Sequence, residues 1–412
     1  MTSALRHFAV ISSPTPGHLN PLQVLGRTLV ERGHRVTMVH VPDAAHLITD
    51  PAIGYAPLPD AGIADPFDVF LGKLARPNGP VGLQRMIRST ATMTQALLSG
   101  APGVIERIGA DAVIADAVEP AGPLVARQLG IPYAHTVTGL PLLAELGVPP
   151  PFMGWRYWPG MAGRVRNHGG YAMADVLMRP LARVLDDHRR RWGLSDTEDD
   201  ALYVAQCPRG LDYPRNELPP RFRYGTRWRR AATAALDLPR DDRPLVFCSL
   251  GSLQGSRRAL FATMAAACAA AGGRAVIGHG GGLTPDEAAA LPGDPLVRAF
   301  WPQERVLEHC SAAILHGGFN TVLDALAVGV PIVALPIAFE QPGTASRLAW
   351  IGAGIVLQPR WLGVRALTRA LAAIMGQPRY RQAALRIGTE MAAAGGVDAA
   401  ADAIDAELAG RA

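Results

Sequence analysis

Residues 7–41, HFAVISSPTPGHLNPLQVLGRTLVERGHRVTMVHV, contain a strand, a helix and a second strand in close succession. The apolar run 7–12 reads as a buried strand that ends at a turn rich in proline and glycine. Asn20 is expected to cap the following helix, with Pro21 in its first position. The apolar pattern of 35–41 predicts the next strand. This order predicts the opening unit of a parallel α/β sheet.

The same alternation continues along the chain and restarts after an interruption. Strands are predicted at 112–115 and 132–137, and a second series of strands begins at 245–249. We therefore predict an N-terminal domain over 1–215, an interdomain linker over 216–243 and a C-terminal domain over 244–395. A terminal helix over 396–412 is expected, with the option that it packs back toward the N-terminal domain.

Composition excludes several classes of protein. At 412 residues and 49% hydrophobic content, the chain is large enough for two or three domains with their own cores. Its apolar runs are shorter than the roughly 18 residues of a membrane span. Its four cysteines form no CxxC pair, which favours a reducing compartment. These features predict a cytoplasmic protein.

The charge balance is modestly basic. Forty basic against thirty-five acidic residues give a net charge of +5. This excess is compatible with an anionic substrate, a membrane surface or genomic bias. The arginines are scattered, and no RNA-binding or zinc-finger pattern is present, so nucleic acid is not an expected partner.

The second half carries a group of polar and aromatic residues in a characteristic order. They are Phe300-Trp301-Pro302-Gln303, His316-Gly317-Gly318-Phe319-Asn320-Thr321, Asp324 and Glu340-Gln341. The segment His316-Gly317-Gly318 lies where a strand ends and a helix begins. There, backbone N–H groups and the helix dipole favour an anion, so we predict a diphosphate site.

The remaining members of this group suit the other parts of a nucleotide sugar. Asn320 and Thr321 add hydrogen-bond donors in the first helical turn, and Asp324 suits the vicinal hydroxyls of a ribose. Phe300 or Trp301 is placed to stack on a nucleobase, and Gln303 could bond the base or the ribose. Glu340 and Gln341 follow a strand at the sheet edge where α/β proteins hold ligands, and they suit sugar hydroxyls.

Two titratable residues in the first half are candidates for catalysis. His18 follows the first strand, beside a helix N-terminus whose dipole is expected to keep the imidazole neutral, as a general base requires. Asp116 ends the strand 112–115 at the same edge and could orient the histidine. Glu119 is a reserve candidate. A purely structural role, with His18 capping a loop and Asp116 capping a helix, stays open on position alone.

These motifs together resemble the nucleotide-sugar signature of the family 1 glycosyltransferases of the GT-B class. The family pattern runs W-x-P-Q, H-x-G-x-N-[ST], an acid one turn later, and [DE]-Q. The resemblance implies two Rossmann-like α/β domains whose parallel sheets face a central cleft. It assigns base stacking to Phe300, a phosphate contact to Ser252 in the turn 249–252, and catalysis to His18 with Asp116.

The resemblance also implies a reaction. The segments E-P-A-G at 119–122 and S-L-G-S-L-Q-G at 249–255 are similar to the branch that glucosylates carotenoids. This implies transfer of glucose from UDP-glucose to the hydroxyls of zeaxanthin or a similar xanthophyll, with inversion. No D-x-D motif is present, so we expect no metal and no cofactor. Two alternatives remain: another lipophilic acceptor, such as a polyketide, macrolide or sterol, and a nucleotide-sugar epimerase of the same fold.

A lipophilic acceptor would reside in a bilayer, so peripheral contact with an anionic membrane, at the inner face of the cell membrane, is also expected. The candidate is the insertion 152–166, which carries apolar anchors and arginines: Phe152, Met153, Trp155, Tyr157, Trp158, Arg156, Arg164 and Arg166. The alternative is that these aromatics pack inside the N-terminal domain or line its acceptor channel.

Overall fold

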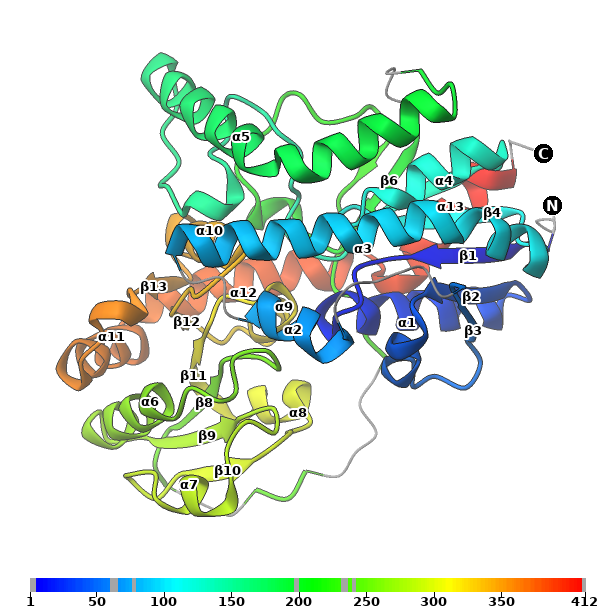
Figure 1. Ribbon diagram of the computed structural model, residues 1–412. Helices are drawn as coiled ribbons and strands as arrows, with labels where there is room; N and C mark the ends of the chain where they lie inside the picture. Colours follow the sequence, from blue (N-terminus) through cyan, green and yellow to red (C-terminus); the bar gives the residue numbers. More distant parts are fainter. Residues whose placement is uncertain are drawn as a thin grey trace.

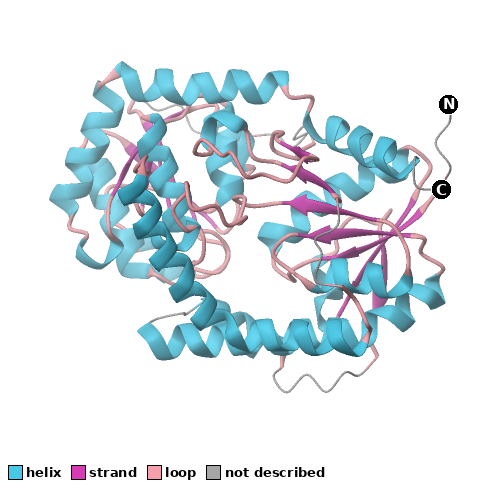
Figure 2. Cartoon of the chain, turned by 90° about the horizontal axis from the view of Figure 1, so that it is seen from above, coloured by secondary structure: helices cyan, strands magenta, loops and turns pink. Residues whose placement is uncertain are grey.

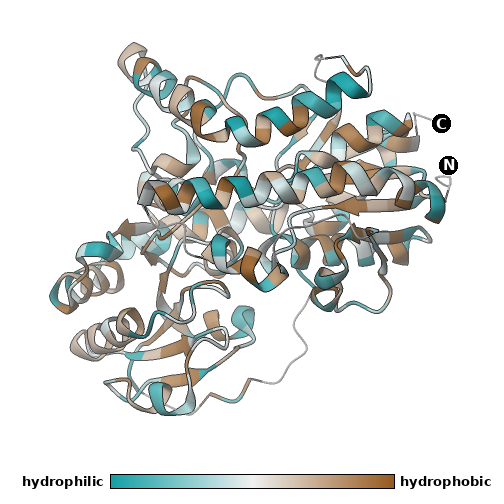
Figure 3. Ribbon diagram, viewed as in Figure 1, coloured by the Kyte–Doolittle hydropathy of each residue, from teal (hydrophilic) through white to brown (hydrophobic). Residues whose placement is uncertain are grey.

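A computed structural model describes residues 5–59, 66–75, 79–195, 200–230, 236–238 and 242–409. Two parallel β-sheets, each covered by helices, form two α/β domains (Figure 1). Seen from above, the strands of each sheet lie between helices (Figure 2). The central strands of each sheet, among them β1 (His7–Ile11), β4 (Ala112–Asp116) and β8 (Leu245–Ser249), are hydrophobic (Figure 3) and buried along their whole length. The predicted α/β class with two parallel sheets is confirmed.

The N-terminal sheet has the strand order β3-β2-β1-β4-β5-β6-β7, and each adjacent pair is parallel. Its strands are β1 (His7–Ile11), β2 (Arg35–His40), β3 (Gly54–Pro57), β4 (Ala112–Asp116), β5 (Tyr133–Val137), β6 (Leu202–Ala205) and β7 (Phe222–Arg223). The α-helices of this half are α1 (Pro16–Glu31), α2 (Phe67–Ala75), α3 (Gly79–Ile108), α4 (Ala121–Leu129) and α5 (Met161–Arg191). Its 3₁₀ turns are η1 (Pro42–Leu47), η2 (Pro151–Met153) and η3 (Arg209–Leu211).

The C-terminal sheet has the strand order β10-β9-β8-β11-β12-β13 and is also parallel. Its strands are β8 (Leu245–Ser249), β9 (Arg274–Gly278), β10 (Leu296–Arg298), β11 (Cys310–Leu315), β12 (Ile332–Ala334) and β13 (Gly354–Val356). Its helices are α6 (Arg258–Ala270), α7 (Pro285–Ala289), α8 (Gln303–Leu307), α9 (Phe319–Ala327), α10 (Gln341–Ile351), the 3₁₀ turn η4 (Pro359–Trp361), α11 (Val364–Gly376) and α12 (Pro378–Ala393).

Helix α1 begins earlier than the sequence predicted. Its N-cap is Thr15 and its first residue is Pro16, so Pro21 lies inside the helix and Asn20 is not a cap. A proline inside a helix has no N–H for the carbonyl four residues earlier, which here belongs to Gly17. The helix accommodates this because Gly17 O accepts a hydrogen bond from outside the helix, as described below.

The last helix, α13 (Gly396–Ala409), returns to the N-terminal domain. It packs against α1 and β6, and its buried residues Ala401, Ile404 and Leu408 join the core of that domain. The two ends of the chain lie side by side (Figure 1), where Arg6 donates a 2.7 Å hydrogen bond to Leu408 O.

Two expected segments fall partly outside the described residues. These are positions 410–412 of the terminal helix, and 231–235 and 239–241 of the expected linker. Within the described part, the 216–243 stretch contributes β7 to the N-terminal sheet. No helix of the described residues combines the length and hydropathy that a bilayer span requires.

Candidate functional site

A cavity of about 620 Å³ lies between the two domains, beside the carboxyl ends of the strands of both sheets. Its lining includes His18 and every donor-site residue predicted from the sequence except Asp324: Ser252, Phe300, Gln303, His316, Gly318, Asn320, Thr321, Glu340 and Gln341. Its N-terminal side also carries apolar side chains: Leu74, Met86, Ile87, Leu142, Phe152 and Met178. One cavity is therefore lined by polar side chains on one side and by apolar side chains on the other.

His18 lies on the first turn of α1, and its side chain is hydrogen-bonded to Asp116, the last residue of β4. Its Nδ1 is 2.9 Å from Oδ2 of Asp116 and 2.7 Å from Oγ1 of Thr138. Asp116 is almost fully buried and also accepts hydrogen bonds from Ser12 (2.8 Å) and Thr138 (3.1 Å). An ionised carboxylate is an acceptor only, so Nδ1 carries the proton of a neutral His18 and Nε2 has the free lone pair.

The pKa of His18 differs from the sequence expectation. Burial is the largest single effect and lowers this pKa, but the charge and hydrogen bond of Asp116 and the charge of Glu340 together raise it above 6.5. The net shift is therefore opposite to the lowering of the pKa that the helix N-terminus alone was expected to cause. The charge of Asp116, whose carboxylate is 2.9 Å from Nδ1, favours the imidazolium. The raised pKa makes the imidazole a stronger proton acceptor.

Glu119, the reserve candidate, is separated from the cavity. It is buried, accepts hydrogen bonds from Thr94 Oγ1 (2.9 Å) and Ala121 N (3.2 Å), and does not line the cavity. Burial raises the pKa of this carboxyl to about 7, against the opposing effect of the two hydrogen bonds. Its position at the start of α4 supports the fold.

His316 lies at the end of β11 between two glycines. A Cβ on Gly251 would come within 2.8 Å of its ring, and a Cβ on Gly318 within 2.3 Å, so both positions require glycine. The ring is buried, and burial lowers its pKa to about 4 despite an opposing backbone contact at Ser249. Its Nδ1 has no hydrogen-bond partner in the described part of the chain. Buried polar atoms usually have a hydrogen-bond partner, so a ligand bound at this position is expected to supply the partner of His316 Nδ1.

Asn320, on the first turn of α9, joins the domains. Its Nδ2 donates a 2.6 Å hydrogen bond to Gly17 O, and its Oδ1 accepts one of 2.8 Å from Gln206 Nε2. Gln206 is fully buried and also donates to Thr138 O. The first turn of α9 therefore contacts Gly17, the neighbour of His18, directly and Thr138 through Gln206.

Asp324 is placed differently from the other donor-site residues. It is almost fully buried and outside the cavity lining, and its carboxylate is 3.1 Å from Arg227 Nη1 and 3.3 Å from Arg229 Nε. Gln303 Nε2 also donates to it at 2.6 Å. Sequence reasoning missed the two arginines because they lie in the stretch read as a linker. Arg229 itself lines the cavity.

The two aromatic residues after β10 have separate environments. Trp301 Nε1 donates a 3.0 Å hydrogen bond to Ile277 O, and Arg298 lies 4.1 Å over the Trp301 ring. Phe300 is 71% exposed at the cavity edge. Phe300 is therefore the ring that remains open to stacking, the position that the motif register assigned to it.

The Glu340-Gln341 pair begins α10 after a strained turn. Phe339 has φ of 55°, a left-handed conformation that is costly for an aromatic residue. The side-chain oxygen of Gln341 accepts 2.9 Å hydrogen bonds from the backbone N–H groups of Ile337 and Ala338 and so holds this turn. Glu340 faces His18, and burial raises the pKa of Glu340 although His18 opposes that rise.

Comparisons with known proteins place this site in a family. The chain is 34% identical to the zeaxanthin glucosyltransferase of Pantoea ananas over 97% of this chain and 96% of that protein. It is 33% identical to the zeaxanthin glucosyltransferase of Pseudescherichia vulneris over 98% and 99% of the two chains. The chain belongs to the family 1 glycosyltransferases. A model of the C-terminal domain of proteins similar to erythromycin biosynthesis protein CIII also matches residues 266–403 of this glycosyltransferase.

Solved structures share the fold of this glycosyltransferase. The calicheamicin glycosyltransferase CalG4 superposes with a TM-score of 0.76 at 23% identity, over 99% of both chains. The glycosyltransferase VinC in complex with DTDP gives a TM-score of 0.70 at 20% identity, over 99% and 100% of the two chains. The predicted GT-B architecture is confirmed.

Proposed function

We propose that this enzyme transfers glucose from UDP-glucose to the hydroxyl groups of zeaxanthin or a similar xanthophyll, with inversion at the anomeric carbon. The main support for the proposal is one observation. His18 of the N-terminal domain and His316 with Gly318 of the C-terminal domain line the same cavity. Similarity over nearly the whole chain to two zeaxanthin glucosyltransferases supports the acceptor class. The apolar side chains at the N-terminal side of the cavity suit a hydrocarbon acceptor.

In the proposed reaction, His18 Nε2 accepts the proton of the acceptor hydroxyl. Asp116, bound to Nδ1, stabilises the imidazolium that forms. The acceptor oxygen attacks the anomeric carbon from the side opposite the diphosphate, and the bond from that carbon to the diphosphate oxygen breaks. The configuration is therefore inverted, and UDP leaves with the bonding electron pair.

Hydrogen-bond donors of the C-terminal domain would stabilise the negative charge on the departing diphosphate. The N-terminus of α9, the unpartnered Nδ1 of His316 and the side chains of Ser252, Asn320 and Thr321 are the available donors. A diphosphate at this turn would compete with Gly17 for the Asn320 amide. We propose that these groups suffice without a divalent metal ion.

An acceptor screen tests this proposal. Purified enzyme is incubated with UDP-glucose and a panel of xanthophylls, sterols and macrolides, and the products are identified by mass and anomeric configuration. We expect β-glucosides of xanthophylls. Transfer only to other acceptors would replace the xanthophyll assignment. Conversion of UDP-glucose to another nucleotide sugar without an acceptor would favour the epimerase alternative.

A further inference from the structure

We propose that the outer faces of α2, α3 and the N-terminal half of α5 bind an anionic lipid bilayer. This inference rests on the proposed function, in that a lipophilic acceptor must leave a membrane to reach the cavity. It is carried by three observations: an exposed apolar stripe, an adjoining group of basic side chains, and the contribution of the same helices to the cavity wall.

The apolar stripe begins just before α5 and follows that helix. Met161 is 74% exposed and Val165 is 66% exposed, and Trp158 and Val176 are exposed as well. At 100° per residue, Met161, Val165 and Val176 fall within about 60° of arc, so they share one side of the helix. Exposed apolar side chains aligned in this way are typical of an interaction surface.

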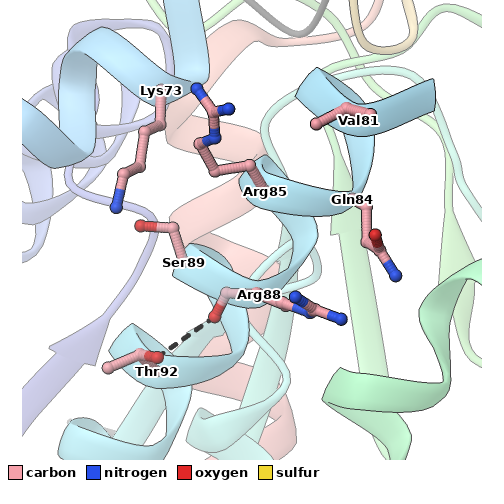
Figure 4. Close-up of a pocket in the computed structure, with 7 residues that line it drawn as sticks. All are labelled: Lys73, Val81, Gln84, Arg85, Arg88, Ser89 and Thr92. Carbon is pink, nitrogen blue, oxygen red and sulfur yellow. Dashed lines mark hydrogen bonds between the residues drawn. The ribbon is translucent and has the colours of Figure 1, made fainter. Parts of the chain in front are cut away.

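Positive charge accompanies the stripe. Between residues 156 and 183 the sequence has five arginines and one acidic residue, Asp175. A separate cavity of about 280 Å³ at the junction of α2 and α3 adds Lys73, Arg85 and Arg88, together with Ser89 and Thr92 (Figure 4). Basic residues beside exposed apolar ones fit a bilayer with anionic headgroups, because such headgroups supply the opposite charge.

The same three helices form the apolar wall of the main cavity. Leu74 of α2, Met86 and Ile87 of α3 and Met178 of α5 line it from the inside. Helix α3 packs against both α2 and α5 (Figure 1), so the helices of the proposed bilayer surface also carry side chains that line the cavity.

This surface differs from the insertion predicted from the sequence. Tyr157 stacks on Tyr213, with ring centroids 5.0 Å apart, and Phe152 lines the main cavity. Trp155 packs so closely on α5 that a Cβ on Gly170 would come within 2.8 Å of its ring. Of the predicted aromatic anchors, Trp158 is the one that remains on the proposed surface.

Vesicle flotation tests the surface without using catalysis. The full-length enzyme is mixed with vesicles of phosphatidylglycerol and phosphatidylcholine, or of phosphatidylcholine alone. We expect binding to the anionic vesicles. Met161→Ser with Val165→Ser should lower the partition coefficient at least about tenfold through lost apolar burial. Arg85→Gln with Arg88→Gln should lower it roughly 30-fold, at about 1 kcal/mol per arginine.

Matched controls lie on the C-terminal domain. Trp361→Ser with Leu385→Ser removes exposed apolar side chains, and Arg365→Gln with Arg369→Gln removes two exposed arginines. These controls should leave vesicle binding unchanged. All four double variants should keep wild-type transfer to a short water-soluble alcohol, which shows that they fold.

The outcomes separate this proposal from the proposed function. Absence of wild-type binding to anionic vesicles, or equal losses in the controls, would overturn the bilayer surface. Vesicle binding that follows the expected pattern, in an enzyme that transfers no glucose to xanthophylls, would support the surface and overturn only the acceptor assignment.

Discussion

The side-chain amide of Asn320 donates a 2.6 Å hydrogen bond to the carbonyl oxygen of Gly17. This carbonyl is the one that Pro21 leaves without a helical donor, so an amide of the C-terminal domain completes the first turn of α1. His18 is the next residue on that turn. The donor side of the cavity and the candidate base are thus linked by a single hydrogen bond.

Replacing Asn320 should weaken this link. Asn320→Ala leaves Gly17 O without its side-chain donor and removes one of the two acceptors of Gln206 Nε2, so the free energy of unfolding should fall by about 1–3 kcal/mol. Urea unfolding followed by circular dichroism measures this change. Thr321→Ala, on the same helical turn, is the control and should cost less. Equal stability of Asn320→Ala and wild type would show that the contact contributes nothing.

Removing the proposed base should affect the rate and spare donor binding. His18→Ala should lower the transfer rate by about 10²–10⁴-fold, the usual range for loss of a general base. Calorimetric titration with UDP should give a nearly unchanged Kd, because the proposed partner of His18 is the acceptor hydroxyl and not the nucleotide. Near wild-type turnover would exclude His18 as the base. Asp116→Asn should also be impaired, since His18 then loses the partner of its Nδ1.

The pH profile should report the raised pKa of His18. The base acts only as neutral imidazole, so kcat/KM should fall as the pH drops through a pKa above 6.5. Asp116→Asn removes the charge that favours imidazolium, so the midpoint of the remaining activity should shift to lower pH. A midpoint that moves upward, or does not move, would contradict the assigned pair. Initial rates at limiting UDP-glucose across pH 5–9, a range set around the usual histidine pKa of about 6.5, provide the measurement.

Transfer should persist without divalent metal. If the α9 N-terminus and the side chains at the His316 turn carry the leaving-group charge, an excess of EDTA should leave the initial rate unchanged. The control is EDTA followed by added magnesium, which should give the same rate. Inhibition by EDTA that magnesium or manganese reverses would show that the charge stabilisation proposed here is incomplete.

Asp324 should contribute strongly to stability. Asp324→Asn leaves Arg227 and Arg229 with Glu304 as their remaining acidic partner, so the loss should stay below the roughly 3–5 kcal/mol of a buried ion pair that is broken completely. Chemical denaturation should show a larger loss for Asp324→Asn than for Arg227→Gln, because Arg229 would still pair with Asp324 in the latter. If Asp324 also contacts the ribose, Asp324→Asn should raise the KM for UDP-glucose. The rise should be smaller for dTDP-glucose, because this donor has no 2′-hydroxyl to lose a contact.

Periodicity and turn chemistry were sufficient to predict the α/β class and two parallel sheets, because buried parallel strands are continuous apolar runs. Most predicted donor-site residues line one cavity, since they follow strands whose carboxyl ends share an edge. The start of α1 was missed because Asn20-Pro21 is a strong helix-start signal. The carbonyl that Pro21 leaves free belongs to Gly17, and its donor, Asn320, lies 303 residues further along the chain.

Other features depend on packing that a sequence does not display. The first turns of α5 contain Gly163, Gly169 and Gly170, and glycine lowers helix propensity, so the sequence gives little sign of a helix here. Gly163 and Gly170 are required there because Trp158 O and the Trp155 ring leave no room for a Cβ. The burial of Asp324 was also unpredictable, since its arginine partners come from a stretch without periodic pattern.

The return of α13 to the N-terminal domain means that the chain passes between the domains twice: once between β7 and β8, and once between α12 and α13. The domains are therefore joined by two covalent connections rather than one. The second connection fixes α13 in the core of the N-terminal domain, and the hydrogen bond from Asn320 to Gly17 ties α9 to α1 as well.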